Sequence, residues 1–142
     1  MNTETLQTKL RRLDEIILLP GNPKKHDVSD IKESFRTWGV LKTFGVNPET
    51  GHDIDGNGRL ETLRMMYAAG EDAPKNVVVK REKVDGKLVN VWYVLTVDLP
   101  FDRETEDIVA LRLNRGQDKG GYDEQKVFDV LEQAAAYGRL EQ

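Results

Sequence analysis

Hydrophobic residues recur at helical spacing in four segments of this chain, with polar turns between them. The first segment predicts a helix over residues 28–38, with Phe35 and Trp38 on its buried face. The second predicts a helix that runs from Arg59 to Gly70. Two more helices are predicted toward the C-terminus, from Asp102 or Thr105 to a stop after residues 114–116, and from Asp123 onward.

Strand spacing fills most of the remaining chain. β-branched and other apolar residues predict strands over residues 10–19, 41–46, 52–55, 77–84 and 88–97. The second and third of these face each other across a Pro- and Gly-containing turn, and the last two flank Asp85-Gly86, a strong hairpin signal. Strands and helices are mixed without regular βαβ order, so the predicted class is α+β.

Composition and charge narrow the classes of protein and the kinds of site that this chain can form. At 142 residues, with 38% hydrophobic and 32% charged residues, the chain is predicted to be a single domain over residues 1–142 with a core of its own. It contains no cysteine, which excludes disulfides, thiolate zinc sites and cysteine nucleophiles. A net charge of −4 gives no global basic field for non-specific DNA binding. No signal-like start and no apolar run of about 20 residues is present, so a cytoplasmic location without membrane insertion is expected.

The segment Asp55–Arg59, called the glycine turn below, is the main candidate for chemistry. Its two glycines let the backbone turn sharply and approach a ligand closely. The predicted helix that follows would direct free N–H groups and a positive dipole end at an anion, and Arg59 adds a planar donor suited to phosphate. From spacing alone, a plain strand-to-helix turn is an equally good interpretation.

Several short motifs, in order, resemble the ParB/sulfiredoxin-like domain. Asn22-Pro23-Lys24-Lys25-His26 is similar to the family's Asn-Pro-Arg-x-His, and Gly56-Asn57-Gly58-Arg59 to its Gly-His-x-Arg. Leu113-Asn114-Arg115 followed by Gly120-Gly121-Tyr122-Asp123-Glu124 resembles a segment of phage and plasmid "ParB-like nuclease" domains. The resemblance covers about residues 10–132 and implies a small mixed β-sheet with flanking helices, here with an extended hairpin inserted.

The resemblance also implies a ligand, since members of this family bind CTP or ATP. It assigns phosphate contacts to Gly56, Asn57, Gly58 and Arg59. It further implies that two other segments reach the same pocket, one through Lys24, Lys25 and His26, and one through Asn114 and Arg115.

Departures from the family pattern bear on catalysis. Asn57 stands where the family has an ionisable His or Glu, and an amide cannot act as a general base. Leu113 stands at a position that is acidic in the family and cannot hold Mg²⁺. Sulfiredoxin activity is excluded because the chain has no cysteine.

Three candidate residues remain for an enzyme. Asp53 and Asp55 share one face of a predicted strand and could hold a divalent ion such as Mg²⁺ near the phosphates, and His26 could supply a base. A solvated or capping role is the alternative for the aspartates, and a surface position for His26. His52 is interpreted as structural.

The 77–97 hairpin is a second candidate surface. Trp92 and Tyr93 point to opposite faces of one strand, so one of them could lie outside. Basic residues surround this strand and could accompany contact with nucleic acid or protein: Lys80, Arg81, Lys83 and Lys87. Ordinary sheet packing is the alternative.

The favoured hypothesis is a nucleotide-binding ParB-like module of a phage, plasmid or mobile element, with CTP or ATP as ligand. Any DNA would be reached through another protein or domain, because the family's DNA-reading region would lie beyond this core. The alternatives are a metal-dependent nuclease or nucleoside triphosphatase, and a scaffold that keeps the fold without the ligand. The oligomeric state is not predicted.

Overall fold

Six strands and three α-helices form this α+β structure, seen in a computed structural model that describes residues 5–20 and 28–118, with side chains through Leu113. The elements in chain order are β1 Thr8–Arg12, the 3-10 helix η1 Leu13–Glu15, β2 Ile17–Leu18, α1 Val28–Trp38, β3 Phe44–Val46, β4 His52–Asp53, α2 Asn57–Ala68, β5 Val78–Val84, β6 Lys87–Asp98 and α3 Arg103–Asp118.

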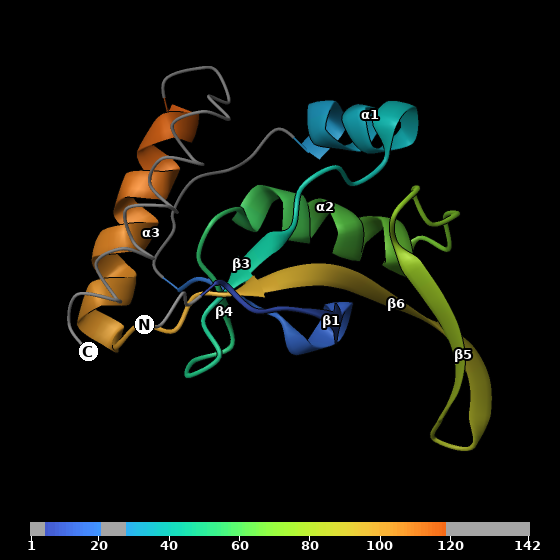
Figure 1. The fold of residues 1–142 in the computed structure, drawn as a ribbon. Helices are drawn as coiled ribbons and strands as arrows, with labels where there is room; N and C mark the ends of the chain where they lie inside the picture. The colour runs from blue at the N-terminus through green and yellow to red at the C-terminus, as the bar shows by residue number, and fades with distance from the viewer. Residues whose placement is uncertain (1–4, 21–27, 119–142) are drawn as a thin grey trace.

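The sheet is mixed, and β6 pairs with three of the other strands. Its strand order is β1-β6-β3-β4-β2, with β5 paired to the other half of β6. β3 runs parallel to β6 and β2 parallel to β4, whereas the other pairs are antiparallel. β6 is long enough to pair with β1 and β3 near its C-terminal end and with β5 near its start, so the β5–β6 hairpin projects beyond the body of the sheet (Figure 1).

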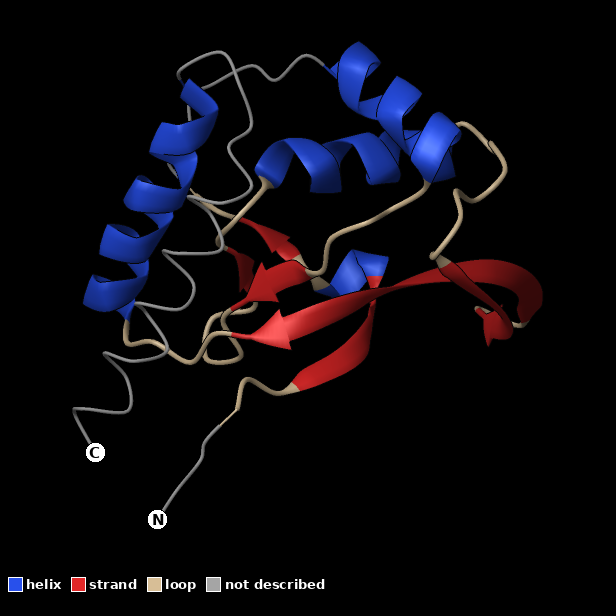
Figure 2. Ribbon diagram, turned by 45° about the horizontal axis from the view of Figure 1, so that its top comes forward, coloured by secondary structure: helices blue, strands red, loops and turns tan. Residues whose placement is uncertain are grey.

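Helices cover one face and one end of the sheet. α2 lies on the sheet and α1 lies on α2, whereas α3 lies across the end opposite the hairpin (Figures 1 and 2). A first apolar cluster is formed by buried residues of α1, α2 and the strands and loops that they cover: Leu13, Ile16, Phe35, Val40, Phe44, Val46, Leu60, Leu63, Met66, Trp92 and Val94. A second apolar cluster is formed by α3 and the residues that it covers: Ile54, Val97, Leu99, Phe101, Val109, Ala110 and Leu113.

Most predicted helices and strands are confirmed. The predicted turn over residues 47–51 is present, and in it the amides of Thr50 and Gly51 both donate to the Asn47 carbonyl. The predicted single strand over residues 10–19 is wrong. β1 ends at Arg12 opposite Tyr93, and the chain passes through η1 before β2 pairs with β4.

Two further predictions require correction. Trp38 is 65% exposed, because α1 ends there and Val40, two residues on, takes the buried position instead. The stop predicted after residues 114–116 comes two residues early, because α3 continues through Gly116 to Asp118. A single glycine inside a helix costs only about 1 kcal/mol relative to alanine, which a packed helix tolerates.

Within residues 5–20 and 28–118, no helix combines the length and the apolar character needed to cross a bilayer.

The first apolar cluster should dominate stability, and α2 allows a matched comparison. Leu63 is fully buried whereas Met65, on the same helix, is 56% exposed. Leu63→Ala should lower the free energy of unfolding by about 2–5 kcal/mol, because it leaves a cavity in a packed core. Met65→Ala should change it by less than about 0.5 kcal/mol. Urea denaturation measures both, and equal losses would contradict this description of the core.

Candidate functional site

The start of α2 lacks the capping groups that usually compensate a helix N-terminus. The helix begins at Asn57, and Gly56 at its N-cap position makes no side-chain hydrogen bond. Its first turn contains no acidic residue. α3 differs, because Asp102 Oδ1 accepts from the Thr105 amide at 2.8 Å and acidic side chains follow in its first turn. The partial positive charge at the start of α2 is therefore not offset by capping or acidic side chains of its first turn.

The glycine turn lies between the two apolar clusters. Ile54, just before it, is fully buried in the second cluster, and Leu60, just after it, is fully buried in the first. Gly56, Asn57 and Gly58 are themselves buried. Both ends of the turn are thus fixed by packing, which holds the backbone of the turn in one position.

Gly56 leaves room for the Arg59 side chain. Its backbone is extended, with φ at 175°, so another residue could adopt this conformation. A Cβ atom there, however, would lie 3.0 Å from Nε of Arg59. Glycine therefore allows the guanidinium group to pack against the turn.

Arg59 points back toward the chain that enters β3. Its Nη1 donates to the Lys42 carbonyl and its Nη2 to the Thr43 carbonyl, both at 3.2 Å. Nη2 lies 3.5 Å from Asp55 Oδ1, and the guanidinium carbon lies 4.4 Å from the centre of the Phe44 ring. The side chain fastens the glycine turn to β3. Contact between Arg59 and phosphate stays a prediction. Such a contact would require the hydrogen bonds from Arg59 to the Lys42 and Thr43 carbonyls to be shared or rearranged.

Asn57 has a structural role that the sequence did not reveal. Its Oδ1 accepts from the Leu19 amide at 2.9 Å, and its Nδ2 donates to the Leu19 carbonyl at 3.1 Å. This reciprocal pair ties the chain after β2 to the first residue of α2. Lys24, Lys25 and His26 follow shortly after Leu19 but lie outside the described residues.

Asp53 and Asp55 are buried carboxyls that contact the backbone of the site. Asp55 Oδ1 accepts from the Gly45 amide at 3.0 Å, and Asp53 Oδ1 accepts from the Asp55 amide at 3.2 Å. Asp53 Oδ2 is buried without a hydrogen-bond partner. Burial raises the pKa of Asp53 well above its usual range, and the charge of Asp55 raises it further, although Arg59 acts in the opposite direction.

The raised pKa of Asp53 opposes binding of a divalent cation, because metals bind the deprotonated carboxylate. In the part of the chain that the structure describes, no group of three or more His, Asp or Glu side chains is arranged to hold a metal. The contacts of Asp53 and Asp55 favour a structural role, and the predicted metal site remains untested.

The third segment predicted to reach the nucleotide, which contains Asn114 and Arg115, begins inside α3. Asn114 and Arg115 lie within this helix, but their side chains are outside the described set. Leu113 is 1% exposed and packs in the second apolar cluster together with Ile54. Its apolar character, a departure from the family pattern, therefore serves the core.

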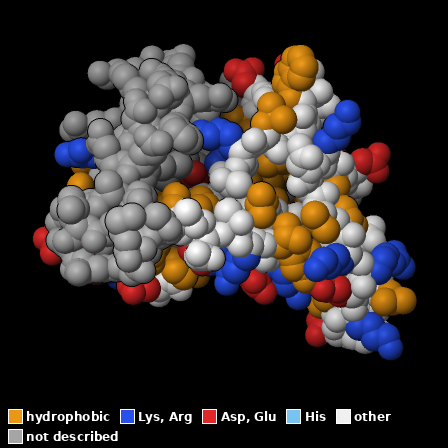
Figure 3. Space-filling view, viewed as in Figure 1, with side chains coloured by type: hydrophobic (Ala, Val, Ile, Leu, Met, Phe, Trp, Pro, Cys, Tyr) orange, Lys and Arg blue, Asp and Glu red, His pale blue; other side chains and the backbone are white. Residues whose placement is uncertain are grey.

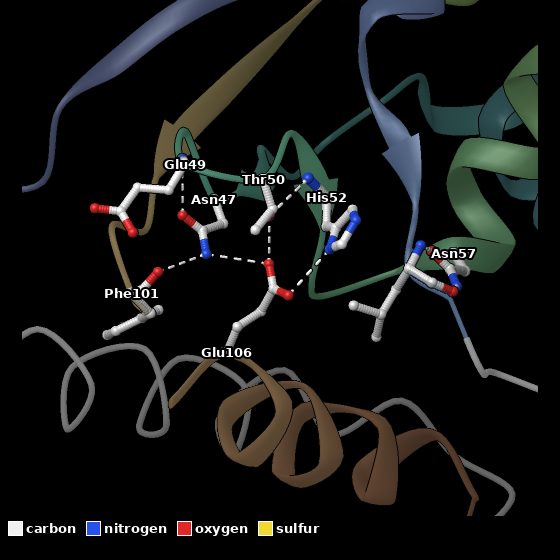
Figure 4. A network of polar contacts seen from close by, with 8 residues as sticks. Asn47, Glu49, Thr50, His52, Asn57, Phe101 and Glu106 are labelled. Atoms are coloured by element: carbon white, nitrogen blue, oxygen red, sulfur yellow. Dashed lines mark hydrogen bonds and ion pairs between the residues drawn. The ribbon is translucent and has the colours of Figure 1, made fainter. Parts of the chain in front are cut away.

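A polar network beside the site joins α3 to the β3–β4 turn (Figure 4). Glu106, 1% exposed, accepts from Asn47 Nδ2 at 3.1 Å and from Thr50 Oγ1 at 2.5 Å, and its Oε2 lies 3.0 Å from His52 Nδ1. Asn47 Nδ2 also donates to the Phe101 carbonyl at 2.8 Å. The structural interpretation of His52 agrees with this network. No local pattern in the sequence connects residues so far apart.

The pKa of Glu106 reflects two opposing effects. Burial would raise it, but the hydrogen bonds from Thr50, His52 and Asn47 outweigh burial, so the pKa lies below its ordinary value. Folding thus favours the ionised carboxylate, which fixes the start of α3 against the sheet.

Substituting Asp53 should change how stability depends on pH. Because its pKa is raised in the folded state, the stability that Asp53 contributes is fully present below its unfolded pKa, near 4, and is lost as pH rises through the folded pKa. Asp53→Asn is isosteric and always neutral, so its advantage over the wild type should grow as pH rises. Urea denaturation from pH 4 to 8 measures this, and parallel curves for the two proteins would contradict a raised pKa of Asp53.

Substituting Glu106 should have the opposite pH dependence. Glu106→Gln should lower the free energy of unfolding by about 1–3 kcal/mol at neutral pH, because a charged acceptor is lost from a buried network. The pKa of Glu106 is depressed by folding, so the loss should shrink as pH falls through the folded pKa. Glu104→Gln, at an exposed position of the same helix, is the control. A Glu106→Gln loss that is equal to the control or independent of pH would contradict the role of the network.

Comparison with solved structures finds this chain similar to a Pnob8-like ParB-N domain in a C2221 crystal form. The TM-score is 0.48 and the sequence identity 14%, over 94% of this chain and 45% of that one. This chain therefore spans less than half the length of the solved chain. No protein-family model matches, and no curated protein does.

Proposed function

We propose that this domain binds a nucleoside triphosphate, CTP or ATP, and that the phosphates lie at the start of α2. The observation that carries the proposal is the uncapped N-terminus of α2. This terminus lies within the glycine turn, and the first turn of the helix contains no acidic residue. Such a terminus favours an anion through the helix dipole and through the amides of Asn57 and Gly58, whereas the amides of Arg59 and Leu60 donate to the Gly56 carbonyl.

The connections of the glycine turn support convergence of three segments. The bonds between Asn57 and Leu19 hold the chain that leads to Lys24, Lys25 and His26 beside the turn. The packing of Leu113 with Ile54 does the same for the part of α3 that leads to Asn114 and Arg115. These five residues are the proposed additional contacts to the nucleotide.

Binding is better supported than catalysis. The proposed catalytic pair, Asp55 and His26, would need Asp55 free to act, but its carboxylate accepts from Gly45 and lies beside Arg59. Asn57, which occupies the position of a possible base, is held by Leu19. We therefore propose a nucleotide-gated binding module, in which phosphate at the turn acts on β3 through Arg59 and Asp55.

The proposed setting is a DNA-related process of a phage, plasmid or other mobile element. DNA sequence specificity would come from another domain or protein. This setting rests on the family resemblance of the motifs rather than on a described contact.

Calorimetric titration with each of CTP, ATP, GTP and UTP, with and without Mg²⁺, tests the proposal. The wild type should bind CTP or ATP with a dissociation constant in the micromolar range, which corresponds to a binding free energy of about −8 kcal/mol. Asn57→Asp adds negative charge where the phosphates are proposed to lie and should weaken binding by about tenfold or more. Arg59→Ala should have a similar effect.

Arg81→Ala is the matched control for Arg59→Ala, because Arg81 lies on the hairpin and its side chain contacts Asn90. It should leave the affinity within about twofold, as expected for a distant surface charge. Thermal melting of each variant shows whether it is folded under the binding conditions. A folded wild type that binds none of the four nucleotides would refute the proposed function.

A further inference from the structure

A groove of about 560 Å³ lies at the hairpin end of the molecule, away from the glycine turn. The buried side chains of Leu13, Val91 and Trp92 form apolar walls. The remaining lining comes from the end of β1, η1, α2 and the hairpin: Arg12, Asp14, Arg64, Tyr67, Val84 and Val89. On the face shown in Figure 3, hydrophobic side chains lie next to Lys and Arg at this end of the molecule.

One wall of the groove is a strand edge that lacks a neighbouring strand. β1 pairs with β6 only as far as Arg12, opposite Tyr93. The part of β6 before Tyr93 pairs with β5 on one side, and among the described residues no strand pairs with its other side. Such an edge presents unpaired backbone groups that can pair with an added strand.

The contact between Tyr67 and Asn90 identifies backbone groups at this edge. The Tyr67 hydroxyl, on α2, donates to the Asn90 carbonyl at 2.6 Å. Backbone groups of alternate residues in a strand point to the same edge, so Leu88 and Trp92 share the direction of Asn90. A carbonyl oxygen has two lone pairs, so Asn90 can accept a second bond from an incoming strand.

The charge around the groove favours an acidic occupant. Six basic side chains lie in the groove and on the hairpin, against three acidic ones, although the whole chain carries −4: Arg12, Arg64, Lys80, Arg81, Lys83 and Lys87, against Asp14, Glu82 and Asp85. Two of the acidic groups already have cationic or hydroxyl partners, since Asp14 pairs with Arg12 and Glu82 accepts from Tyr93. The excess positive charge faces solvent on an otherwise acidic protein.

We propose that this groove binds an extended peptide of another protein, in which apolar residues alternate with acidic ones. The peptide would add as a strand to the open edge of β6 between Leu88 and Trp92. Its apolar side chains would pack on Val84, Val89 and Val91, and its acidic side chains would pair with the surrounding basic groups. Backbone pairing supplies affinity in this mode, and the side-chain contacts supply specificity.

Fluorescence polarisation with a labelled peptide tests the proposal on the full chain. The probe is a peptide of alternating Glu and Val, about seven residues long, which matches a strand of ordinary length. Two control peptides replace its Glu with Lys or its central Val with Pro, which cannot donate to a strand ladder. The acidic peptide should bind at least about tenfold more tightly than either control, and its binding should weaken as salt is raised.

Two exposed β-branched residues provide matched variants. Val84 lines the groove, whereas Ile108 lies on α3, at the end of the molecule opposite the hairpin (Figure 1). Both are exposed, so Glu at either position should leave the fold intact. Val84→Glu should weaken binding of the acidic peptide by about tenfold or more, because it places a negative charge in the groove, and Ile108→Glu by less than about twofold.

Several results would overturn the proposal. They are equal binding of all three peptides, equal effects of the two Glu variants, and absence of binding. A wild-type dimer in sedimentation velocity that only Val84→Glu dissociates would also overturn it, because the occupant would then be a second copy of this chain. None of these results depends on nucleotide binding, so this proposal and the proposed function can fail separately.

Discussion

The chain must leave β4 and begin α2 within a few residues, and side chains from the turn itself hold it in place. Asp55 accepts from the β3 backbone at Gly45, Asn57 pairs with Leu19, and Arg59 donates to two carbonyls ahead of β3. Asp and Asn side chains at a helix start often accept hydrogen bonds from its first N–H groups. Here each fastens a neighbouring segment, so the helix N-terminus itself remains without a cap.

This arrangement gives the two ends of the molecule different properties. At one end, the glycine turn, β3 and the start of α3 are joined by packing and by the buried Glu106 network, which makes this part rigid (Figure 4). At the other end, β6 extends past β1 with only β5 beside it, which leaves an open edge and an excess of basic side chains. The open strand edge follows from the length of β6 and from where its partners end, whereas the proposed anion site depends on the glycine turn and the start of α2.

The sequence predicted local features well and long-range contacts poorly. The bounds of α1, the Asp85-Gly86 hairpin and the Asp102 cap follow from spacing and turn chemistry within a few residues of chain. The break of the 10–19 segment into two strands depends on partners far along the chain, as does the exposure of Trp38. The inward direction of Arg59 could not be predicted either, because its acceptors are backbone carbonyls with no sequence signature.

The central claim is that the start of α2 binds phosphate. Backbone amide chemical shifts of ¹⁵N-labelled protein, followed during titration with CTP and then ATP, test it most directly. The account predicts that the largest shifts fall on the amides of Asn57, Gly58, Arg59 and Leu60, whereas those of the hairpin around Asp85 stay in place. It would be contradicted if saturating nucleotide left the first four amides unshifted, or if the shifts fell only on the groove beside β6.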